Sequence, residues 1–163
     1  MTDMIKIFLL TAVLFAATAP YQTATAFDPR CPVATEQRAR ALAEKAAAFL
    51  KAHGPDKAFA VFTARTEGFG AGDLYVFVFD LHGTLRASGG WPGHVGSTVI
   101  GPGNDGGGLY HRFRRLALAK PGRGWIHYNW YSPCTRTMQP KMTYVIRVGG
   151  FIVGVGAYKV PGV

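Results

Sequence analysis

The sequence predicts an α+β domain that combines helices with one five-stranded, mainly antiparallel sheet. Apolar residues recur with helical spacing between residues 33 and 56. From Leu74 the period changes to two, as in a half-buried strand. Three more strand-like segments close the chain, and Gly149-Gly150 joins the last two as a hairpin. The order of helix, two strands, loop and helix, and three strands is typical of the α+β class.

The helices are predicted from spacing and from their end signals. Thr35 is suited to cap the first helix, and Gly54-Pro55 ends it. Pro55 also favours the start of a short second helix that runs to residue 64. A further helix is predicted over residues 108–122, "GLYHRFRRLALAKPG", and ends at Pro121-Gly122.

The strands follow from the alternation of side chains. The first is predicted over Leu74–Asp80, and the turn "LHG" leads into its hairpin partner, "TLRAS". Residues 89–108 are rich in Gly and Pro and are expected to form a loop. The remaining strands are predicted at Trp125–Trp130, Met142–Val148 and Phe151–Lys159.

Alternation also assigns side chains to the two faces of the sheet. Tyr75 falls on the opposite face of the first strand from its neighbours, and Trp125 and Tyr128 fall on opposite faces of theirs. Gly154 and Gly156 share a face of the last strand, where the missing side chains allow a helix or a ligand to approach closely.

The amino terminus has the features of an export signal. Residues 7–19 are almost entirely apolar, and "ATA" at Ala24–Ala26 offers the small residues that precede signal-peptidase cleavage. The apolar run is short for a membrane-spanning helix. We therefore expect residues 1–26 to be a signal peptide and the domain to be periplasmic or secreted. The alternative is an uncleaved segment that anchors the chain to the membrane.

An exported chain with two cysteines is expected to pair them. Cys31 and Cys134 are the only cysteines, so a disulfide between them is predicted. It would fasten the amino-terminal helix to the second half of the chain.

Charge is distributed unevenly along the chain. All nine acidic residues lie at or before Asp105, whereas nine of the 18 Lys and Arg residues follow it, so the net charge of +9 arises there. The cations are scattered over a helix, loops and strands without a dense stripe, and export makes nucleic acid an unusual partner. We expect no nucleic-acid binding, although the basic half leaves open an anionic polymer or a membrane surface.

No motif in the sequence indicates catalysis. Residues Gly101–Gly106 match a dinucleotide-binding pattern, but no acidic residue follows to bind the ribose. The five histidines show no metal-ligand spacing, and no nucleophile-elbow motif frames a serine. We expect a protein that is not an enzyme and uses neither cofactor nor metal.

Four ordered blocks resemble the single Cache domain family, of the second single-Cache type, whose members are extracytoplasmic sensors with a PAS-like sheet. The blocks are "GDLYVFVFDLHGTLRASGGWPGHVGSTV", "GWIHYNWYSP", "QPKMTYV" and "FIVGVGAYK". The resemblance extends over residues 34–159, which we take as one ligand-binding domain. It implies a long amino-terminal helix behind the sheet and a pocket for a small organic acid on the other face.

The resemblance also implies the residues of this pocket. Lys141 would pair with a carboxylate, Trp125 would close the apolar wall, and three tyrosines would donate hydrogen bonds: Tyr75, Tyr128 and Tyr144. Arg112 and Arg115 would serve as secondary anion contacts. Ser132 and Gln139 stand where the family often has acidic residues or Asn, which would make the rim more positive and favour more highly charged anions.

The chain shows neither the transmembrane segment nor the signalling module that follow a Cache sensor. We therefore expect a free-standing module that binds a small carboxylate reversibly and acts through a separate membrane receptor or transporter. The alternative is a structural or interaction domain that binds an anionic polymer or membrane surface through its basic half.

Overall fold

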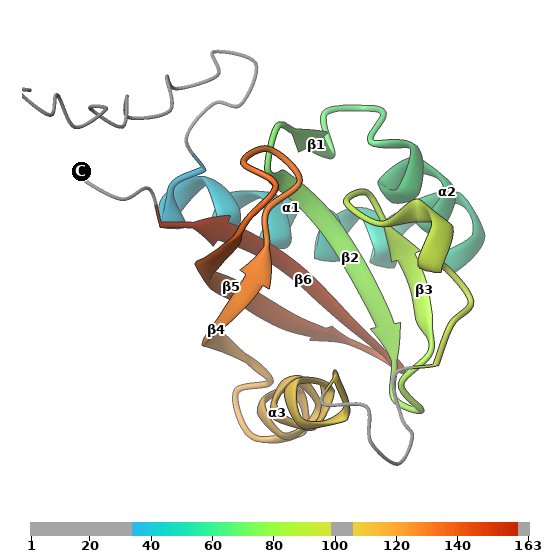
Figure 1. The fold of residues 1–163 in the computed structure, drawn as a ribbon. Coiled ribbons are helices and arrows are strands. Elements are labelled where there is room, and N and C mark those ends of the chain that lie inside the picture. Colours follow the sequence, from blue (N-terminus) through green and yellow to red (C-terminus); the bar gives the residue numbers. More distant parts are fainter. Residues whose placement is uncertain (1–33, 99–105, 160–163) are drawn as a thin grey trace, which may run out of the picture.

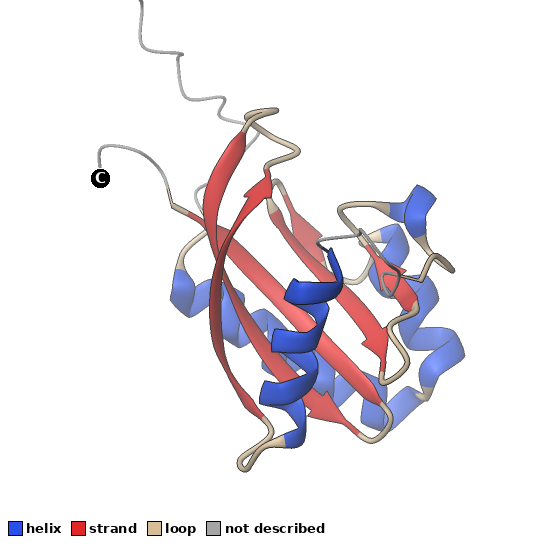
Figure 2. Ribbon diagram, turned by 60° about the horizontal axis from the view of Figure 1, so that its bottom comes forward, coloured by secondary structure: helices blue, strands red, loops and turns tan. Residues whose placement is uncertain are grey.

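The computed structural model describes residues 34–98 and 106–159, which form a curved sheet with helices on both faces (Figures 1 and 2). The expected signal peptide, residues 1–26, and Cys31 lie outside the described residues. The signal peptide and the Cys31–Cys134 disulfide therefore stay predictions. Among the described helices, none is both long and apolar enough to cross a membrane.

The sheet has six strands, all paired antiparallel, in the order β3-β2-β6-β5-β4, and the short β1 also pairs with β2. The strands are β1 (Gly70–Ala71), β2 (Leu74–Asp80), β3 (Leu85–Ser88), β4 (Arg123–Tyr131), β5 (Met138–Val148) and β6 (Phe151–Tyr158). The predicted α+β class with an antiparallel sheet is confirmed. The two-residue β1 was not predicted, because so short a segment has no period to detect.

The turn between β2 and β3 follows directly from its sequence. Asp80 Oδ1 accepts hydrogen bonds from the backbone N–H groups of His82 and Thr84, both at 2.9 Å. Gly83 has φ of 91°, a left-handed conformation that glycine adopts without strain.

Strands β4 and β5 extend further than predicted. Strand β5 begins at Met138 rather than Met142, although Pro140 lies within it. Proline cannot donate a ladder hydrogen bond, so its position is a poor signal for a strand. The extension matters for function because it places Lys141 in regular pairing with Tyr128 of β4 and Tyr158 of β6.

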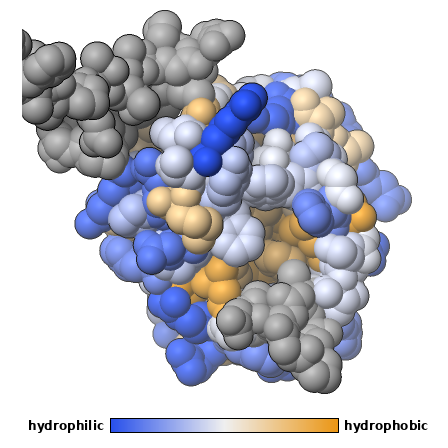
Figure 3. All heavy atoms as spheres, viewed as in Figure 1, coloured by the Kyte–Doolittle hydropathy of each residue, from blue (hydrophilic) through white to orange (hydrophobic). Residues whose placement is uncertain are grey.

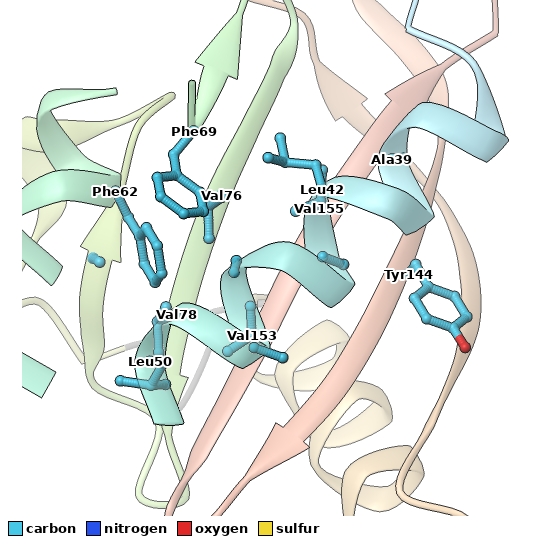
Figure 4. Close-up of a cluster of buried hydrophobic side chains, with 14 of the residues drawn as sticks. Ala39, Leu42, Leu50, Phe62, Phe69, Val76, Val78, Tyr144, Val153 and Val155 are labelled. Atoms are coloured by element: carbon cyan, nitrogen blue, oxygen red, sulfur yellow. The ribbon is translucent and has the colours of Figure 1, made fainter. Parts of the chain in front are cut away.

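Helices α1 (Glu36–His53) and α2 (Pro55–Ala64) cover one face of the sheet. Thr35 caps α1 as predicted, because its side chain accepts a hydrogen bond from the Arg38 N–H at 3.2 Å. Small residues on α1, including Ala39 and Ala43, are fully buried and let the helix lie close to the strands. Larger side chains such as Leu50 then fill the layer between them (Figure 4).

Helix α3 (Gly106–Leu118) crosses the opposite face of the sheet (Figure 2). It ends before the predicted residue 122. Tyr110 and Phe113 of α3 are buried against that face and form a second core with strand residues. A single turn of 3-10 helix, η1 (Pro92–His94), lies in the segment predicted as loop. The sheet thus separates two apolar layers, and the second contains a cavity.

Candidate ligand-binding site

A cavity of about 440 Å³ lies between the sheet and the segments that cover its α3 face. Figure 3 shows hydrophobic side chains gathered in a hollow on this side of the molecule. Its volume is in the usual range for small-molecule sites. The lining residues are Tyr75, Phe77, Phe79, Leu85, Ser88, Trp91, His94, Ser97, Leu109, Tyr110, Phe113, Tyr128, Trp130, Tyr131, Met138 and Lys141.

Lys141 extends into this cavity from the middle of the sheet, with only 1% of the residue exposed to solvent. Its carbon chain lies across Gly156 of β6, where a Cβ would overlap Lys141 Cε. Gly154 provides the same space for the ring of Phe77. The glycine face of β6 therefore receives side chains of the protein itself, which fixes the direction of Lys141.

The Lys141 ammonium is held by tyrosine side chains. Nζ donates hydrogen bonds to Tyr75 Oη at 2.8 Å and to Tyr158 Oη at 3.1 Å. It also lies 4.3 Å and 4.4 Å from the centroids of the same two rings. Contact with the ring faces stabilises a cation, and more strongly where water is excluded.

The described residues provide no carboxylate for this ammonium. Their ion pairs are Arg40–Glu44 and Arg86–Asp80. Asp73 is buried, but it accepts hydrogen bonds from Ser132 Oγ at 2.6 Å and from the Cys134 N–H at 3.0 Å. A buried charge is costly unless it is paired and hydrogen-bonded. The site therefore has a positive charge with no carboxylate in direct contact among the described residues, while Asp73 lies near enough to help raise the pKa of Tyr158.

The tyrosine hydroxyls around Lys141 differ in acidity. Burial alone would raise the pKa of Tyr75, but the adjacent Lys141 ammonium outweighs it, and the pKa of Tyr75 is lowered. Burial, together with the neighbouring Tyr75, raises the pKa of Tyr158. Burial likewise raises the pKa of Tyr128. Tyr75 is thus the tyrosine of this group that ionises most readily.

At this end of the cavity two hydrogen-bond donors have no acceptor among the described groups, and a third, the Tyr75 hydroxyl, has only a distant one. Lys141 Nζ has three protons and uses two on tyrosines. Tyr75 Oη accepts from Lys141. Because the Tyr158 proton goes to the Tyr131 carbonyl, Tyr75 donates to Tyr158 Oη, over a long 3.4 Å. The buried Trp91 Nε1 lies beside the Tyr75 hydroxyl without hydrogen-bond geometry. Together the three suit a carboxylate, which accepts several hydrogen bonds.

The segment "SGGW", Ser88 to Trp91, positions the indole. Ser88 Oγ accepts a hydrogen bond from the Trp91 backbone N–H at 3.0 Å. Gly89 and Gly90 pass directly over Tyr75, and a Cβ on Gly90 would overlap its ring. Gly90 is needed because the backbone packs on the aromatic ring, and Gly89 because a Cβ there would lie 2.9 Å from the Phe62 carbonyl oxygen and from Arg65 Cγ.

Three of the five residues predicted as ligand contacts line the cavity: Tyr75, Tyr128 and Lys141. Trp125 and Tyr144 lie on the other face, where their rings are 4.9 Å apart and Arg40 lies over Tyr144. Strands β4 and β5 pair in regular register without a bulge, so alternation separates Trp125 from Tyr128. We do not propose Trp125 or Tyr144 as ligand contacts.

The two arginines expected as secondary anion contacts lie away from the cavity. Arg112 is exposed and donates to the His127 carbonyl at 2.9 Å, and Arg115 is exposed on the same helix. Neither lines the cavity, which α3 approaches with Leu109, Tyr110 and Phe113.

Sequence reasoning missed Tyr158 and Trp91. Tyr158 follows Gly154 and Gly156 at the same alternating positions of β6, so strand periodicity had the signal to find it. Trp91 lies in a Gly- and Pro-rich segment with no period, and only the structure shows where its indole points. Within the described residues, no three potential metal ligands come together.

No protein-family model and no curated protein matches the chain. Solved structures do. A periplasmic sensor domain of a chemotaxis protein is 25% identical with a TM-score of 0.54, covering 76% of this chain and 90% of that one. A methyl-accepting chemotaxis protein from Vibrio parahaemolyticus is 18% identical with a TM-score of 0.56, covering 75% and 86%.

A third similar structure is a Cache chemosensory domain described for its recognition of carboxylic acids. It is 20% identical with a TM-score of 0.59, and covers 76% of this chain and 92% of that one. All three similarities show the same fold, and the 25% identical structure places it in the class of periplasmic sensor domains. Within that class the fold is that of a single Cache domain, and the resemblance seen in the sequence is confirmed at the level of the fold.

Proposed function

We propose that this chain is an extracytoplasmic Cache module that reversibly binds a small organic acid in the cavity described above. The observation that carries the proposal is the Lys141 ammonium, which is buried in the cavity without a carboxylate partner among the described residues. A bound carboxylate would supply the missing negative charge. Lys141, Tyr75 and Trp91 would donate to it, and Tyr128 would border it.

The similar structures support the same class of ligand. One of them is a Cache chemosensory domain described for carboxylic acid recognition, another is a periplasmic sensor domain, and the third is a methyl-accepting chemotaxis protein. The proposal is for binding without chemical conversion of the acid, as suits a sensor.

Replacement of Lys141 by methionine tests the proposal. Methionine keeps a flexible chain over Gly156 and removes the charge, and because Lys141 has no ion-pair partner among the described residues, the change leaves no opposite charge buried alone. In a thermal-unfolding screen against acetate, propionate, butyrate, hexanoate and benzoate, the unaltered protein should be stabilised by at least one acid. An acid at about 100 times its Kd contributes roughly 2.7 kcal/mol.

Lys141→Met should lose that stabilisation, whereas Lys120→Met, at an exposed position, should keep it. If none of the acids stabilises the unaltered protein, or if Lys141→Met responds equally well, the proposed function is wrong.

The same proposal includes a separate partner, a membrane receptor or transporter, that recognises the occupied module. Met138 and Tyr131 line the cavity and are also exposed, 63% and 38%. A ligand in the cavity would therefore contact side chains that a partner protein can also contact. Capture of a membrane protein that depends on the acid, and is lost with Met138→Glu, would support this part. Capture that is independent of the acid would oppose it.

A second candidate function is favoured by a groove on another side of the domain. Four cations from three segments line it, Lys51, Lys120, Arg123 and Arg147, and no acidic residue lines it with them. These four take part in none of the ion pairs of the described residues. The groove suits an anionic polymer or membrane surface. Binding to heparin or anionic vesicles that Lys120→Gln and Arg123→Gln weaken, but Lys141→Met does not, would establish it.

A further inference from the structure

We infer that the ligand is a monocarboxylate with an apolar body, rather than a dicarboxylate or a larger polyanion. This inference rests on the proposed function and specifies its ligand. It follows from the distribution of polar groups around the cavity. The unmatched donors, on Lys141 and Trp91, and the weakly bonded Tyr75 hydroxyl lie together at one end, so the described lining offers one place for one carboxylate.

Four other polar side chains of the lining, those of Tyr128, Tyr110, Ser97 and Ser88, are already hydrogen-bonded within the protein. Tyr128 Oη and Thr143 Oγ1 are 2.7 Å apart, Tyr110 donates to the Asp80 carbonyl at 3.0 Å, and Ser97 donates to the His94 carbonyl at 2.7 Å. Ser88 Oγ accepts a hydrogen bond from the backbone N–H of Trp91. His94 is exposed and lies at the solvent side of the lining. A second carboxylate inside the cavity would meet no free cation among the described groups.

The expectation of a more positive rim is wrong for this cavity. Ser132 is fully buried and donates to Asp73, and Gln139 donates to Thr137 at 3.2 Å. Neither residue lines the cavity. Their uncharged side chains therefore provide no reason to expect a highly charged anion.

The rest of the wall is hydrocarbon. Tyr75, Phe77 and Phe79 follow one another on the same face of β2, and residues two apart on a strand are separated by about 6.8 Å. The apolar floor thus continues for roughly 13 Å beyond the Tyr75 position. Phe113 of α3 packs directly on it, with its ring centroid 5.6 Å from that of Phe77, so the open volume of about 440 Å³ lies outside this ring contact. A two-carbon acid would leave most of this space unfilled, whereas an aryl or longer aliphatic group would fill it.

Burial of each methylene against this wall should strengthen binding about fourfold. A second carboxylate at the far end of the ligand would be desolvated without a partner. The cavity should therefore prefer hexanoate to adipate, which has the same number of carbons, by on the order of a hundredfold or more.

Isothermal titration of the purified chain with acetate, butyrate, hexanoate, phenylacetate and adipate tests the inference. Affinity should rise from acetate to hexanoate or phenylacetate, and adipate should bind far more weakly than hexanoate. Leu109→Ala, which shortens a side chain of the wall, should reduce the gain in affinity with chain length. Leu118→Ala on the exposed face of the same helix is the matched control.

The possible failures are distinct. If acids bind through Lys141 but affinity does not rise with chain length, or adipate equals hexanoate, the inference is overturned and the proposed function stands. If none of the acids binds the unaltered chain, both are overturned.

Discussion

At the scale of single residues, the site depends on the way the chain keeps an ammonium group inside an apolar layer. Lys141 reaches its position because Gly156 has no side chain, and it stays there through contacts with the rings and hydroxyls of Tyr75 and Tyr158. These contacts stabilise the cation while leaving its charge unneutralised. A carboxylate of the protein in contact with Lys141 would neutralise the ammonium and weaken its attraction for a carboxylate ligand.

The lowered pKa of Tyr75 predicts how acid binding depends on pH. As the pH rises through this pKa, below the usual value of about 10, Tyr75 loses its proton and gains a negative charge beside Lys141. That charge neutralises the ammonium and repels a carboxylate, so acid affinity should fall on the alkaline side. Titration of the Kd with pH, alongside tyrosinate ultraviolet absorbance, measures both events.

Phenylalanine variants identify the group that titrates. Tyr75→Phe should bind the acid more weakly at neutral pH, because a hydrogen-bond donor is lost. Its affinity should not fall at alkaline pH, because the variant has no hydroxyl at position 75 to ionise. Tyr158→Phe should keep the decline, because the pKa of Tyr158 is raised and this hydroxyl stays protonated. An unchanged alkaline decline in Tyr75→Phe would show that another group controls binding.

Gly156 predicts a coupled loss of stability and binding. A Cβ at this position would overlap Lys141 Cε and lie 2.7 Å from Thr143 Oγ1. Gly156→Ala should lower the free energy of unfolding by about 1–3 kcal/mol through overpacking, and should weaken acid binding by displacing Lys141. Gly150→Ala, where a Cβ meets nothing within 4 Å, is the control. Denaturant unfolding and calorimetry would measure the two effects, and a Gly156→Ala protein with normal binding would contradict this account of the Lys141 position.

At the scale of elements, the cavity is formed where β2, β5 and β6 meet, and the β4–β5 hairpin reaches over one end of it. Asp73, just before β2, holds the tip of that hairpin through Ser132 and the Cys134 N–H. The hairpin in turn supports the site, because the Tyr131 carbonyl accepts a hydrogen bond from Tyr158 Oη at 2.8 Å. Elements distant in sequence are thus joined next to Lys141.

The Asp73 contact predicts a measurable contribution to stability. Asp73→Ala removes both acceptors and leaves the buried Ser132 hydroxyl without its partner, which should cost about 1–3 kcal/mol of unfolding free energy. Ser132→Ala should cost less, since the bond to the Cys134 N–H remains. Adding Ser132→Ala to Asp73→Ala should cost little more, as the two share one contact. Fully additive losses in chemical denaturation would contradict this coupling.

The regular elements were predictable from sequence because their patterns are local. Thr35 and Gly54 mark the ends of α1, and alternation from Leu74 marks β2. Alternation also placed Tyr75 and separated Trp125 from Tyr128. The extent of β5 was harder to predict, because Pro140 interrupts the hydrogen-bonding pattern while tertiary pairing on both sides keeps the strand intact.

The composition of the site was less predictable, because it depends on contacts between distant segments. Tyr144 has the same aromatic character as Tyr75, yet it packs under α1, and the sequence alone does not reveal which face each strand turns to the cavity. Trp91 reaches the site through an irregular segment held by Ser88 and by the packing of Gly90 on Tyr75. Such packing follows from the assembled fold rather than from a local pattern.

At the scale of the whole molecule, the sheet separates a structural layer from a binding layer. The α1 side is filled by aliphatic and aromatic side chains, and its core includes the fully buried Val153. The α3 side has a second core around the cavity. The arrangement lets the first layer support the fold while the second retains space for a ligand.

The net charge of +9 predicts that the cavity and the cationic groove respond differently to salt. Exposed charges are screened within about a Debye length, whereas buried pairs are screened much less. Raising the salt concentration from about 0.05 to 0.5 M should therefore change the Kd for a carboxylate by less than about threefold. Heparin binding at the groove should weaken by an order of magnitude or more, because it releases counterions.

The triple variant Lys51→Gln/Lys120→Gln/Arg123→Gln separates the two sites further. It removes three exposed cations of the groove but leaves Lys141 and its tyrosines untouched. Acid binding should persist in this variant at both salt concentrations, while heparin binding is lost. If acid affinity instead falls with salt as steeply as heparin binding, and falls again in the triple variant, the acid is held on the surface, and the buried ammonium is not its partner.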